Sequence, residues 1–161
     1  MAKRKKPNKL PVIVFILIIL FSFVAIAVIN IINFEDYVIA DVLQVSGSTV
    51  IIGNNCTAII AETSPERALA IEEEINGITE QRPNTYDIFA ESLKSFNISL
   101  EYVTLDNFVN GTYYSNLYLK SANKVLKLDS KPSDAIALAL KTNSTIYLNK
   151  TLLNEVGENI C

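Results

Sequence analysis

A long apolar run near the N-terminus divides this 161-residue chain into two unlike parts. Residues 10–32 are almost wholly apolar, and a run of this length is enough for a helix to cross the hydrocarbon core of a bilayer. Residues 1–9 carry five cations and no acid, whereas Glu35 and Asp36 follow the run. Because cytoplasmic flanks carry the excess of Lys and Arg, we expect residues 1–9 to be a basic cytoplasmic tail and residues 10–32 a transmembrane anchor. Residues 33–161 are then an extracellular domain of a single-pass cell-membrane protein, with the lipid bilayer as its first expected partner.

A cleaved signal peptide is the alternative interpretation of the same run, because Ala25 and Ala27 form a small-x-small cleavage pattern. The apolar run continues from Val28 to Ile32, where a polar region would be expected, so the uncleaved anchor is favoured. The domain also contains glycosylation acceptor patterns that agree with export, although an Asn- and Thr-rich composition produces such patterns by chance. They begin at Asn55, Asn97, Asn110, Asn143 and Asn149.

The two cysteines, Cys56 and Cys161, leave two alternatives open. Outside the cell they would pair and close a long loop, which in the chain-entropy model stabilises a fold by about 4–5 kcal/mol. Otherwise they are two unpaired thiols, one of them at the end of the chain.

Composition excludes several classes of function. The chain has no histidine, which excludes His-based acid–base catalysis, a Ser-His-Asp triad and His-ligated zinc. Five of the 14 Lys and Arg lie in residues 1–9, so the domain holds nine cations against all 17 acids, a formal charge of −8. A basic protein that coats nucleic acid is therefore excluded, because its affinity would come from neutralising phosphates.

Alternating patterns and turn residues predict an α+β domain with a mixed or antiparallel sheet. Strands are expected over residues 37–45, 49–52, 57–61, 98–105, 112–120, 125–129 and 145–148, and the three between 98 and 129 form an antiparallel meander. Helices are expected from Ser64 to Asn76, from about Pro83, from Pro132 and over 151–156. Residues 135–140 are apolar on nearly every side, which predicts a buried helix. Phe89, Leu93 and Phe96 recur at helical spacing as a core stripe.

Two similar motifs begin two of these helices, and both carry the candidate site residues. Residues 82–87 and 131–134 share the order cation, proline, hydroxyl and aspartate. A cation beside a helix N-terminus suits a phosphate oxygen, which makes Arg82, Lys131 and Ser133 candidate phosphate-binding residues.

The carboxylates of these motifs are the candidates for catalysis. Asp87 and Asp134 are the candidate catalytic residues, and together with Asp129 they form a candidate ligand set for Mg²⁺ or Mn²⁺. The alternative is purely structural, since Pro at the first helical position and Asp in the first turn make a good helix start with no function attached.

Three runs of sequence make the chain recognisable, at residues 66–71, 82–87 and 129–140. Over Tyr37 to Gly157 it resembles the bifunctional nuclease domain family. The resemblance implies an α+β domain that forms homo-oligomers and an activity that cleaves both RNA and DNA. Family members are usually intracellular, so the expected anchor is a departure. Two local departures are Tyr86, where the family commonly has histidine, and Lys131, where it commonly has arginine.

Two hypotheses follow. The chain is either a membrane-anchored nuclease that hydrolyses RNA or DNA phosphodiesters with the help of a metal, or a non-catalytic surface interaction and assembly domain that keeps the family fold. The acidity of the domain and the missing histidine fit the second hypothesis, and the resemblance favours the first.

Overall fold

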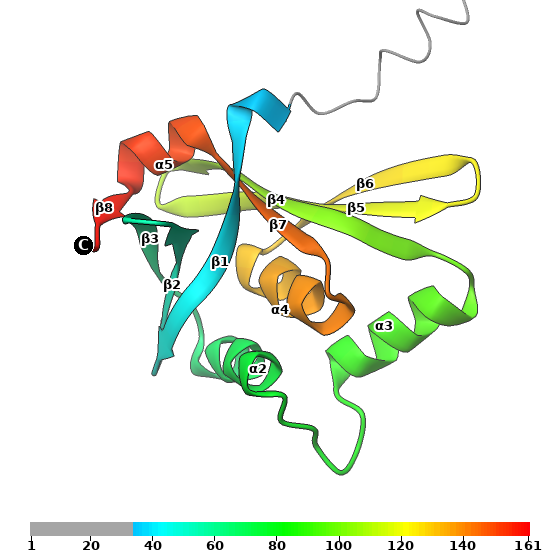
Figure 1. The fold of residues 1–161 in the computed structure, drawn as a ribbon. Coiled ribbons are helices and arrows are strands. Elements are labelled where there is room, and N and C mark those ends of the chain that lie inside the picture. The colour runs from blue at the N-terminus through cyan, green and yellow to red at the C-terminus, as the bar shows by residue number, and fades with distance from the viewer. Residues whose placement is uncertain (1–33) are drawn as a thin grey trace, which may run out of the picture. The chain divides into compact units, whose positions relative to one another are not determined.

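The computed structural model describes residues 34–161, which build one mixed eight-stranded sheet with helices packed against it (Figure 1). The strand order is β6-β5-β4-β7-β1-β2-β3-β8, with only β4 and β7 parallel among these neighbours. In chain order the elements are η1 (Phe34–Asp36), β1 (Tyr37–Ser46), β2 (Thr49–Asn54), β3 (Thr57–Glu62), α2 (Pro65–Asn76), α3 (Thr85–Ser95), β4 (Ser99–Val109), β5 (Thr112–Ser121), β6 (Lys124–Ser130), α4 (Pro132–Thr142), β7 (Thr145–Asn149), α5 (Lys150–Val156) and β8 (Glu158–Asn159). The α+β class and the mixed sheet expected from the sequence are confirmed.

The predicted tail and anchor, residues 1–9 and 10–32, lie outside the described residues. Between Phe34 and Cys161 the structure has no helix that is both long and apolar enough to cross a bilayer.

The antiparallel meander of β4, β5 and β6 follows from its turn chemistry. Asn110 and Gly111 join β4 to β5 with φ values of 51° and 79°, a left-handed backbone that both residues tolerate and that suits the twist of a hairpin. From β6 the chain returns through α4, which places β7 beside β4 and parallel to it. Because β7 also pairs with β1, this return joins the meander to the N-terminal strands in one sheet.

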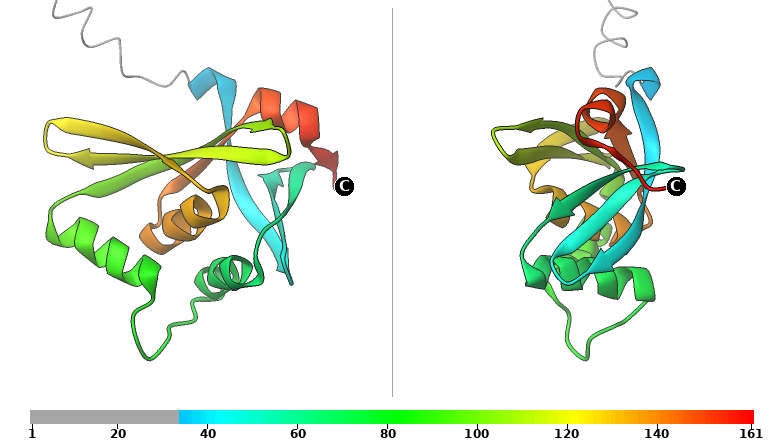
Figure 2. Two further views of the ribbon diagram at one scale, coloured as in Figure 1. Left: turned by 180° about the vertical axis from the view of Figure 1, so that it is seen from behind. Right: turned by 90° about the vertical axis from the view of Figure 1, so that its left-hand side faces the viewer.

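Helix α4 is buried because it lies between two layers. It contacts β4, β5 and β7 on one side and packs against α2 and α3 as well (Figure 2). All five residues from Ala135 to Ala139 are buried, as the apolar pattern predicted. Small side chains at the contact, with Ala68 of α2 fully buried, allow the two helices to approach closely.

The core stripe expected along α3 was wrong for two of its three residues. Leu93 is buried, but Phe89 and Phe96 are 38% and 76% exposed. The cause is the position of α3 at the edge of the fold, where α4 and β4 cover a single flank of the helix. Helical spacing reports that three apolar side chains share a face, whereas the width of the covering surface decides how many are buried.

Cys56 and Cys161 form a disulfide, which settles the two alternatives that the sequence left open. Their Cα atoms are 5.1 Å apart, and the bond joins the β2–β3 turn to the last residue of the chain. Next to it β8 pairs with β3, and the N–H of Ile160 donates to the carbonyl of Cys56. The C-terminus is therefore held at one edge of the sheet.

The asparagines of the glycosylation patterns all have a place in the fold. Four of them are exposed turn or cap residues in the left-handed region, where Asn is tolerated better than most residues: Asn55, Asn97, Asn110 and Asn143. Asn149 is the N-cap of α5 and accepts from the N–H of Thr151. Turn chemistry alone explains these asparagines, and their glycosylation stays a prediction.

We expect the disulfide to contribute strongly to stability, because the two cysteines are 105 residues apart. Replacing both with serine should lower the free energy of unfolding by about 2–5 kcal/mol, mainly by releasing the unfolded chain. Urea titration followed by circular dichroism measures this. In reductant, wild-type protein should have the same free energy of unfolding as the double variant. The disulfide assignment would be contradicted if wild-type protein already had the stability of the variant and reductant did not change it.

Candidate functional site

A cavity of about 360 Å³ lies where the N-terminal ends of α2 and α4 come together. Its polar rim includes Ser64, Arg67, Lys131 and Ser133. The carboxylate of Glu62 and the polar residues Thr63, Thr112 and Tyr113 also line it. The apolar lining comes chiefly from β2, β3 and the two helices: Val50, Ile52, Ile59, Ala61, Ile71, Leu105 and Ile136. The sequence predicted Lys131 and Ser133 as phosphate-binding residues, and the structure places both in this cavity.

The two helices begin in the same way. Each has proline at its first position, after Ser64 in α2 and after Lys131 in α4, and neither preceding side chain caps its helix. The first N–H groups of a helix have no partner within it, and the helix dipole makes this end positive. Two uncapped helix ends at one cavity therefore favour an anion there.

The third residues of the two helices form an ion pair across the cavity rim. Arg67 Nε of α2 lies 3.2 Å from Asp134 Oδ1 of α4. The hydroxyl of Tyr86 in α3 donates to the same oxygen at 2.9 Å. Asp134 thus links three helices, and the two predicted motifs meet through the Tyr86–Asp134 hydrogen bond.

Tyr86 is a hydrogen-bond donor at this site. Burial, and next the hydrogen bond to Asp134, raise the pKa of Tyr86 to about 12. The phenol therefore stays protonated at neutral pH and does not act as a base.

At the N-terminus of α2, an acidic side chain of the protein already occupies the helix end. The N–H of Glu66 and the hydroxyl of Ser64 bind the Glu66 carboxylate, which holds its pKa below the usual value. In α4 the equivalent position is Ser133, which carries no charge. Of the two helix ends, α4 is therefore the better place for an external anion.

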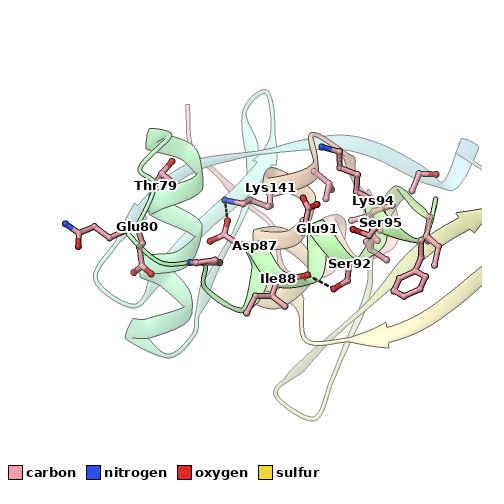
Figure 3. Close-up of a pocket in the computed structure, with 18 residues that line it drawn as sticks. Thr79, Glu80, Asp87, Ile88, Glu91, Ser92, Lys94, Ser95 and Lys141 are labelled. Atoms are coloured by element: carbon pink, nitrogen blue, oxygen red, sulfur yellow. Dashed lines mark hydrogen bonds and ion pairs between the residues drawn. The ribbon is translucent and has the colours of Figure 1, made fainter.

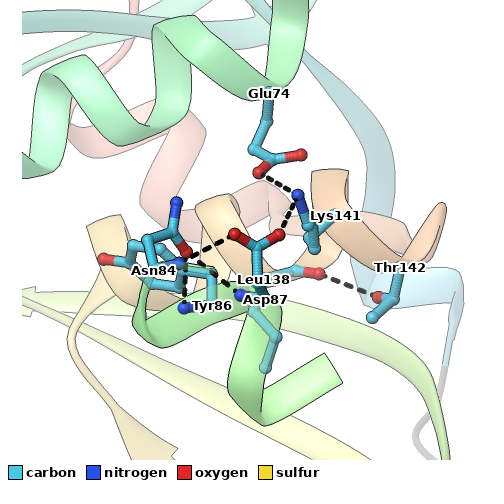
Figure 4. Close-up of polar contacts among 7 residues, drawn as sticks. All are labelled: Glu74, Asn84, Tyr86, Asp87, Leu138, Lys141 and Thr142. Atoms are coloured by element: carbon cyan, nitrogen blue, oxygen red, sulfur yellow. Dashed lines mark hydrogen bonds and ion pairs between the residues drawn. The ribbon is translucent and has the colours of Figure 1, made fainter. Parts of the chain in front are cut away.

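Asp87 has a different environment, away from the cavity rim (Figure 4). Its Oδ2 accepts from the N–H of Asn84 at 2.9 Å in a capping box, and its Oδ1 lies 2.5 Å from Lys141 Nζ. Lys141 also binds Glu74 at 2.9 Å, so one ammonium joins α2, α3 and α4. The hydrogen bond from Lys141, and next the N–H of Asn84, hold the pKa of Asp87 below its usual value.

The three carboxylates predicted to bind Mg²⁺ or Mn²⁺ do not form a common ligand set. Asp134 is bound to Arg67, Asp87 is bound to Lys141, and Asp129 lies exposed near the end of β6 beside Asn116 of β5. Within residues 34–161 no group of three or more carboxylate, Cys or His side chains is placed to hold a metal ion. The residues described therefore do not fit this metal, and we derive no step through it.

Arg82 is exposed in the α2–α3 loop and does not line the cavity. The same loop borders an open groove along α3, which is larger, at about 1010 Å³ (Figure 3). Ile88 and Phe96 expose apolar surface there, and Asp87 and Lys141 already bind each other at its edge. The groove is lined by two cations, Lys94 and Lys141, and by three acids, Glu80, Asp87 and Glu91. The smaller cavity is lined by two cations and one acid, Glu62, so it is the better anion site.

Arg67 is the site residue that sequence reasoning missed. It belongs to the run 66–71, which carries part of the family resemblance and lies in the expected helix from Ser64 to Asn76. Its position as the third residue of a proline-started helix matches that of Asp134, and this correspondence was the available signal.

The fold and the cavity together define an α+β domain with a cavity at the N-terminal ends of two helices. A model of the bifunctional nuclease domain matches residues 54–160 of this chain, and the chain belongs to that family. An uncharacterised protein of Mycobacterium tuberculosis is 29% identical over 94 residues, which cover 58% of this chain and 54% of that protein.

Bifunctional nuclease 1 of Oryza sativa subsp. japonica is 30% identical over 102 residues, covering 62% of this chain and 30% of the rice protein. This chain therefore spans about half of the mycobacterial protein and about a third of the rice protein. The activity of the whole rice protein is not transferred by this match.

We expect Lys141→Met to lower the free energy of unfolding by about 1–2 kcal/mol, since its side chain is only 22% exposed and serves two carboxylates. Because the pKa of Asp87 is lowered and that of Lys141 is raised, this contribution is present at neutral pH and is lost as pH falls below about 4. Urea titrations at pH 7 and pH 3 measure it. Lys120→Met, which removes an exposed pair with Glu101, is the control and should cost less than about 1 kcal/mol. Equal losses in both variants would contradict the prediction.

Tyr86→His should make stability pH-dependent near neutrality. The Asp134 carboxylate favours the imidazolium, so the folded-state pKa should exceed the ordinary value of about 6.5. The resulting stabilisation is present below that value and is lost as pH rises through the raised pKa, so the variant should weaken relative to wild type from pH 6 to pH 8. Tyr86→Phe, which does not titrate, should differ from wild type by a constant amount over the same range. A constant difference for Tyr86→His would show that the imidazole does not reach Asp134.

Proposed function

We propose that this protein is a membrane-anchored hydrolase of RNA or DNA phosphodiesters, which binds the substrate phosphate in the cavity between α2 and α4. The supporting observation is the uncapped N-terminus of α4, which meets Arg67 and Lys131 at one cavity. Membership of the bifunctional nuclease domain family agrees with this proposal.

The proposed phosphate contacts divide between two cations and one helix end. Arg67 uses Nε for Asp134, and a guanidinium has four further N–H donors on its terminal nitrogens. Lys131 is exposed at the rim and supplies a mobile point charge in place of a bidentate fork. Ser133 offers both its hydroxyl and its N–H at the start of α4.

Asp134 is the proposed catalytic carboxylate. Its two contacts, from Arg67 and Tyr86, fall on Oδ1, and the side chain is 38% exposed. We propose that Oδ2 orients a water molecule toward the bound phosphate and accepts its proton. The water oxygen forms the new P–O bond, the P–O bond to the leaving sugar oxygen breaks, and the leaving oxygen receives a proton from Asp134 or from solvent. Asp87 is better suited to a positioning role, since both of its oxygens are bound and it fixes the start of α3, which carries Tyr86.

The local charge of the cavity answers the main objection to this function. The domain carries a formal charge of −8, which would repel a polyanion at long range. At the cavity itself Arg67, Lys131 and the free N-terminus of α4 face one lining carboxylate, Glu62, whose two oxygens already accept hydrogen bonds from Ser48 and Thr49. The two acids beside the cavity, Glu66 and Asp134, are also bound within the protein. A substrate phosphate would meet a locally favourable field.

Binding without hydrolysis is the second candidate function, and Tyr86 is the observation that favours it. The residue that replaces the histidine expected from the family resemblance holds its proton up to about pH 12. A base at that position is thereby lost, whereas the phosphate-binding residues remain. In this case the domain would recognise a phosphorylated ligand or assemble with itself on the cell surface.

The proposed location outside the cell has support from the disulfide. Disulfides persist in oxidising compartments and are rare in the cytosol. The Cys56–Cys161 bond therefore agrees with the topology inferred from the basic residues before the apolar run.

The test measures cleavage and binding of single-stranded RNA and DNA by the purified full chain, in Mg²⁺, in Mn²⁺ and in chelator. Lys131→Met and Arg67→Met should each lower kcat/KM at least about tenfold, because each removes a charged contact to phosphate. Lys124→Met, on exposed strand β6, is the matched control and should leave kcat/KM unchanged. Asp134→Asn should reduce cleavage about 100-fold or more while binding, followed by fluorescence anisotropy, persists.

The outcomes separate the two functions. Binding that depends on Lys131 without any cleavage would support the binding domain. Cleavage that all variants retain would place the activity elsewhere, and a folded protein that neither binds nor cleaves would overturn both proposals.

A further inference from the structure

The sheet face opposite α2 and α4 carries a group of aromatic side chains. Tyr102 and Tyr118 are cross-strand partners with ring centroids 4.5 Å apart, and Tyr147 lies 5.6 Å from Tyr102. Side chains alternate along a strand, and the neighbours of these tyrosines, such as Val103 and Ile146, face the core. The tyrosines therefore belong to the other face of the sheet.

Phe34 and Ile39 extend this group at its exposed border. The ring of Phe34 lies 4.8 Å from Tyr147 and 5.4 Å from Tyr102, and Ile39 is the cross-strand partner of Tyr147. Phe34 is 42% exposed and Ile39 is 54% exposed. We define the aromatic patch as Phe34, Ile39, Tyr102 and Tyr147, which lie at the surface beside Tyr118, itself buried at 8% exposed.

The chain enters the domain at this patch. Phe34 is the first residue that the structure describes, and only Asn33 separates it from the apolar run that ends at Ile32. Two residue steps span at most about 7 Å, since an extended chain advances about 3.3–3.6 Å per residue. If the run is an anchor, Phe34 and the tyrosines that it contacts lie within a few ångströms of the bilayer surface.

We propose that the aromatic patch rests in the headgroup layer of the membrane and orients the domain on it. Tyrosine suits this layer because its ring is apolar and its hydroxyl is polar, and aromatic residues concentrate at membrane interfaces. This inference rests on the anchor that forms part of the proposed function, and it adds the surface by which the domain meets the lipid.

The charges around the patch suit a zwitterionic lipid surface. Lys127 Nζ lies 5.6 Å from the centre of the Tyr118 ring, and Lys150 donates to the carbonyl of Glu35 beside Phe34. Glu35 and Asp36 follow Phe34 in η1, so the surroundings of the patch are mixed in sign. A single-stranded nucleic acid would require a clearly cationic surface around the rings, which this face lacks.

The orientation has a consequence for the cavity. The cavity is lined by α2, α4 and strands β2 and β3, on the side of the sheet that the helices cover. Figure 1 shows α2 and α4 on one side of the sheet and η1, which carries Phe34, on the other. A domain resting on the patch would present the cavity to the solvent.

The chain contains no tryptophan, so single tryptophans report on chosen positions. The full chain is reconstituted into phosphatidylcholine vesicles with and without brominated acyl chains, and fluorescence is compared. Tyr147→Trp and, independently, Ile39→Trp probe the patch. Phe96→Trp, on the highly exposed end of α3, is the matched control, and Phe21→Trp within the apolar run tests the anchor.

We expect brominated lipid to quench the tryptophans at 21, 147 and 39, with at least twofold more quenching at 147 and 39 than at 96. Iodide should quench the tryptophan at 96 more strongly than the two patch positions. Thermal unfolding identifies any variant that fails to fold. If one of the two patch variants does not fold, the other is used for the comparison.

Two results would overturn the proposal while the anchor stands. Quenching by brominated lipid at position 21 but at neither patch position would show that the patch does not contact lipid. If the tryptophans at 39 and 147 were protected from iodide but not quenched by brominated lipid, a second copy of the chain would cover the patch. If that protection required added RNA, a nucleic acid would cover it. Absence of lipid quenching at position 21 as well would refute the anchor itself.

Discussion

The burial of α4 is the constraint on which the rest of this structure depends. A helix that is apolar on nearly every side is stable only when it is covered on every side, so the sheet must lie on one side of it and α2 and α3 on others. Only the two ends of α4 remain available for polar chemistry. Its first turn supplies Ser133 to the cavity and Asp134 to the ion pair with Arg67, and its last turn supplies Lys141 to the junction of the three helices.

Each end of α4 is held by charged and polar side chains from other helices. At the first turn Arg67 and Tyr86 both bind Asp134, and at the last turn Glu74 and Asp87 both bind Lys141. Helices α2 and α3 therefore contact α4 at two points along its axis. These contacts restrict both the rotation of α4 relative to the two helices and the distance between them. This arrangement determines the geometry of the cavity rim, because Arg67 and Ser133 lie on helices that are held together both at Asp134 and at Lys141.

Much of the fold was predictable because it depends on local chemistry. Proline and turn residues placed the starts of α2 and α4 and the β4–β5 turn, and the alternation of side chains placed the strands. The site was predictable only in part. Lys131 and Ser133 were found because a motif marks them, but the pairing of Asp134 with Arg67 joins residues 67 positions apart, and helical periodicity carries no information about such a partner. The same reason explains why Asp87, Asp129 and Asp134 were expected to share a metal, whereas two of them are bound to cations on different helices.

The Cys56–Cys161 bond gives the domain a covalent property that its sheet and helices do not provide. The bond closes a ring that includes every element from β3 to β8, and the exposed α2–α3 loop lies within this ring. A protease that cuts the loop once leaves two pieces that are still joined through sulfur. The piece that carries α3, α4 and β7 thus stays attached to the piece that continues to the N-terminus. Outside a cell, where secreted proteases are common and a released fragment would diffuse away, a nicked molecule would remain whole and in place until a second cut or a reductant separated it.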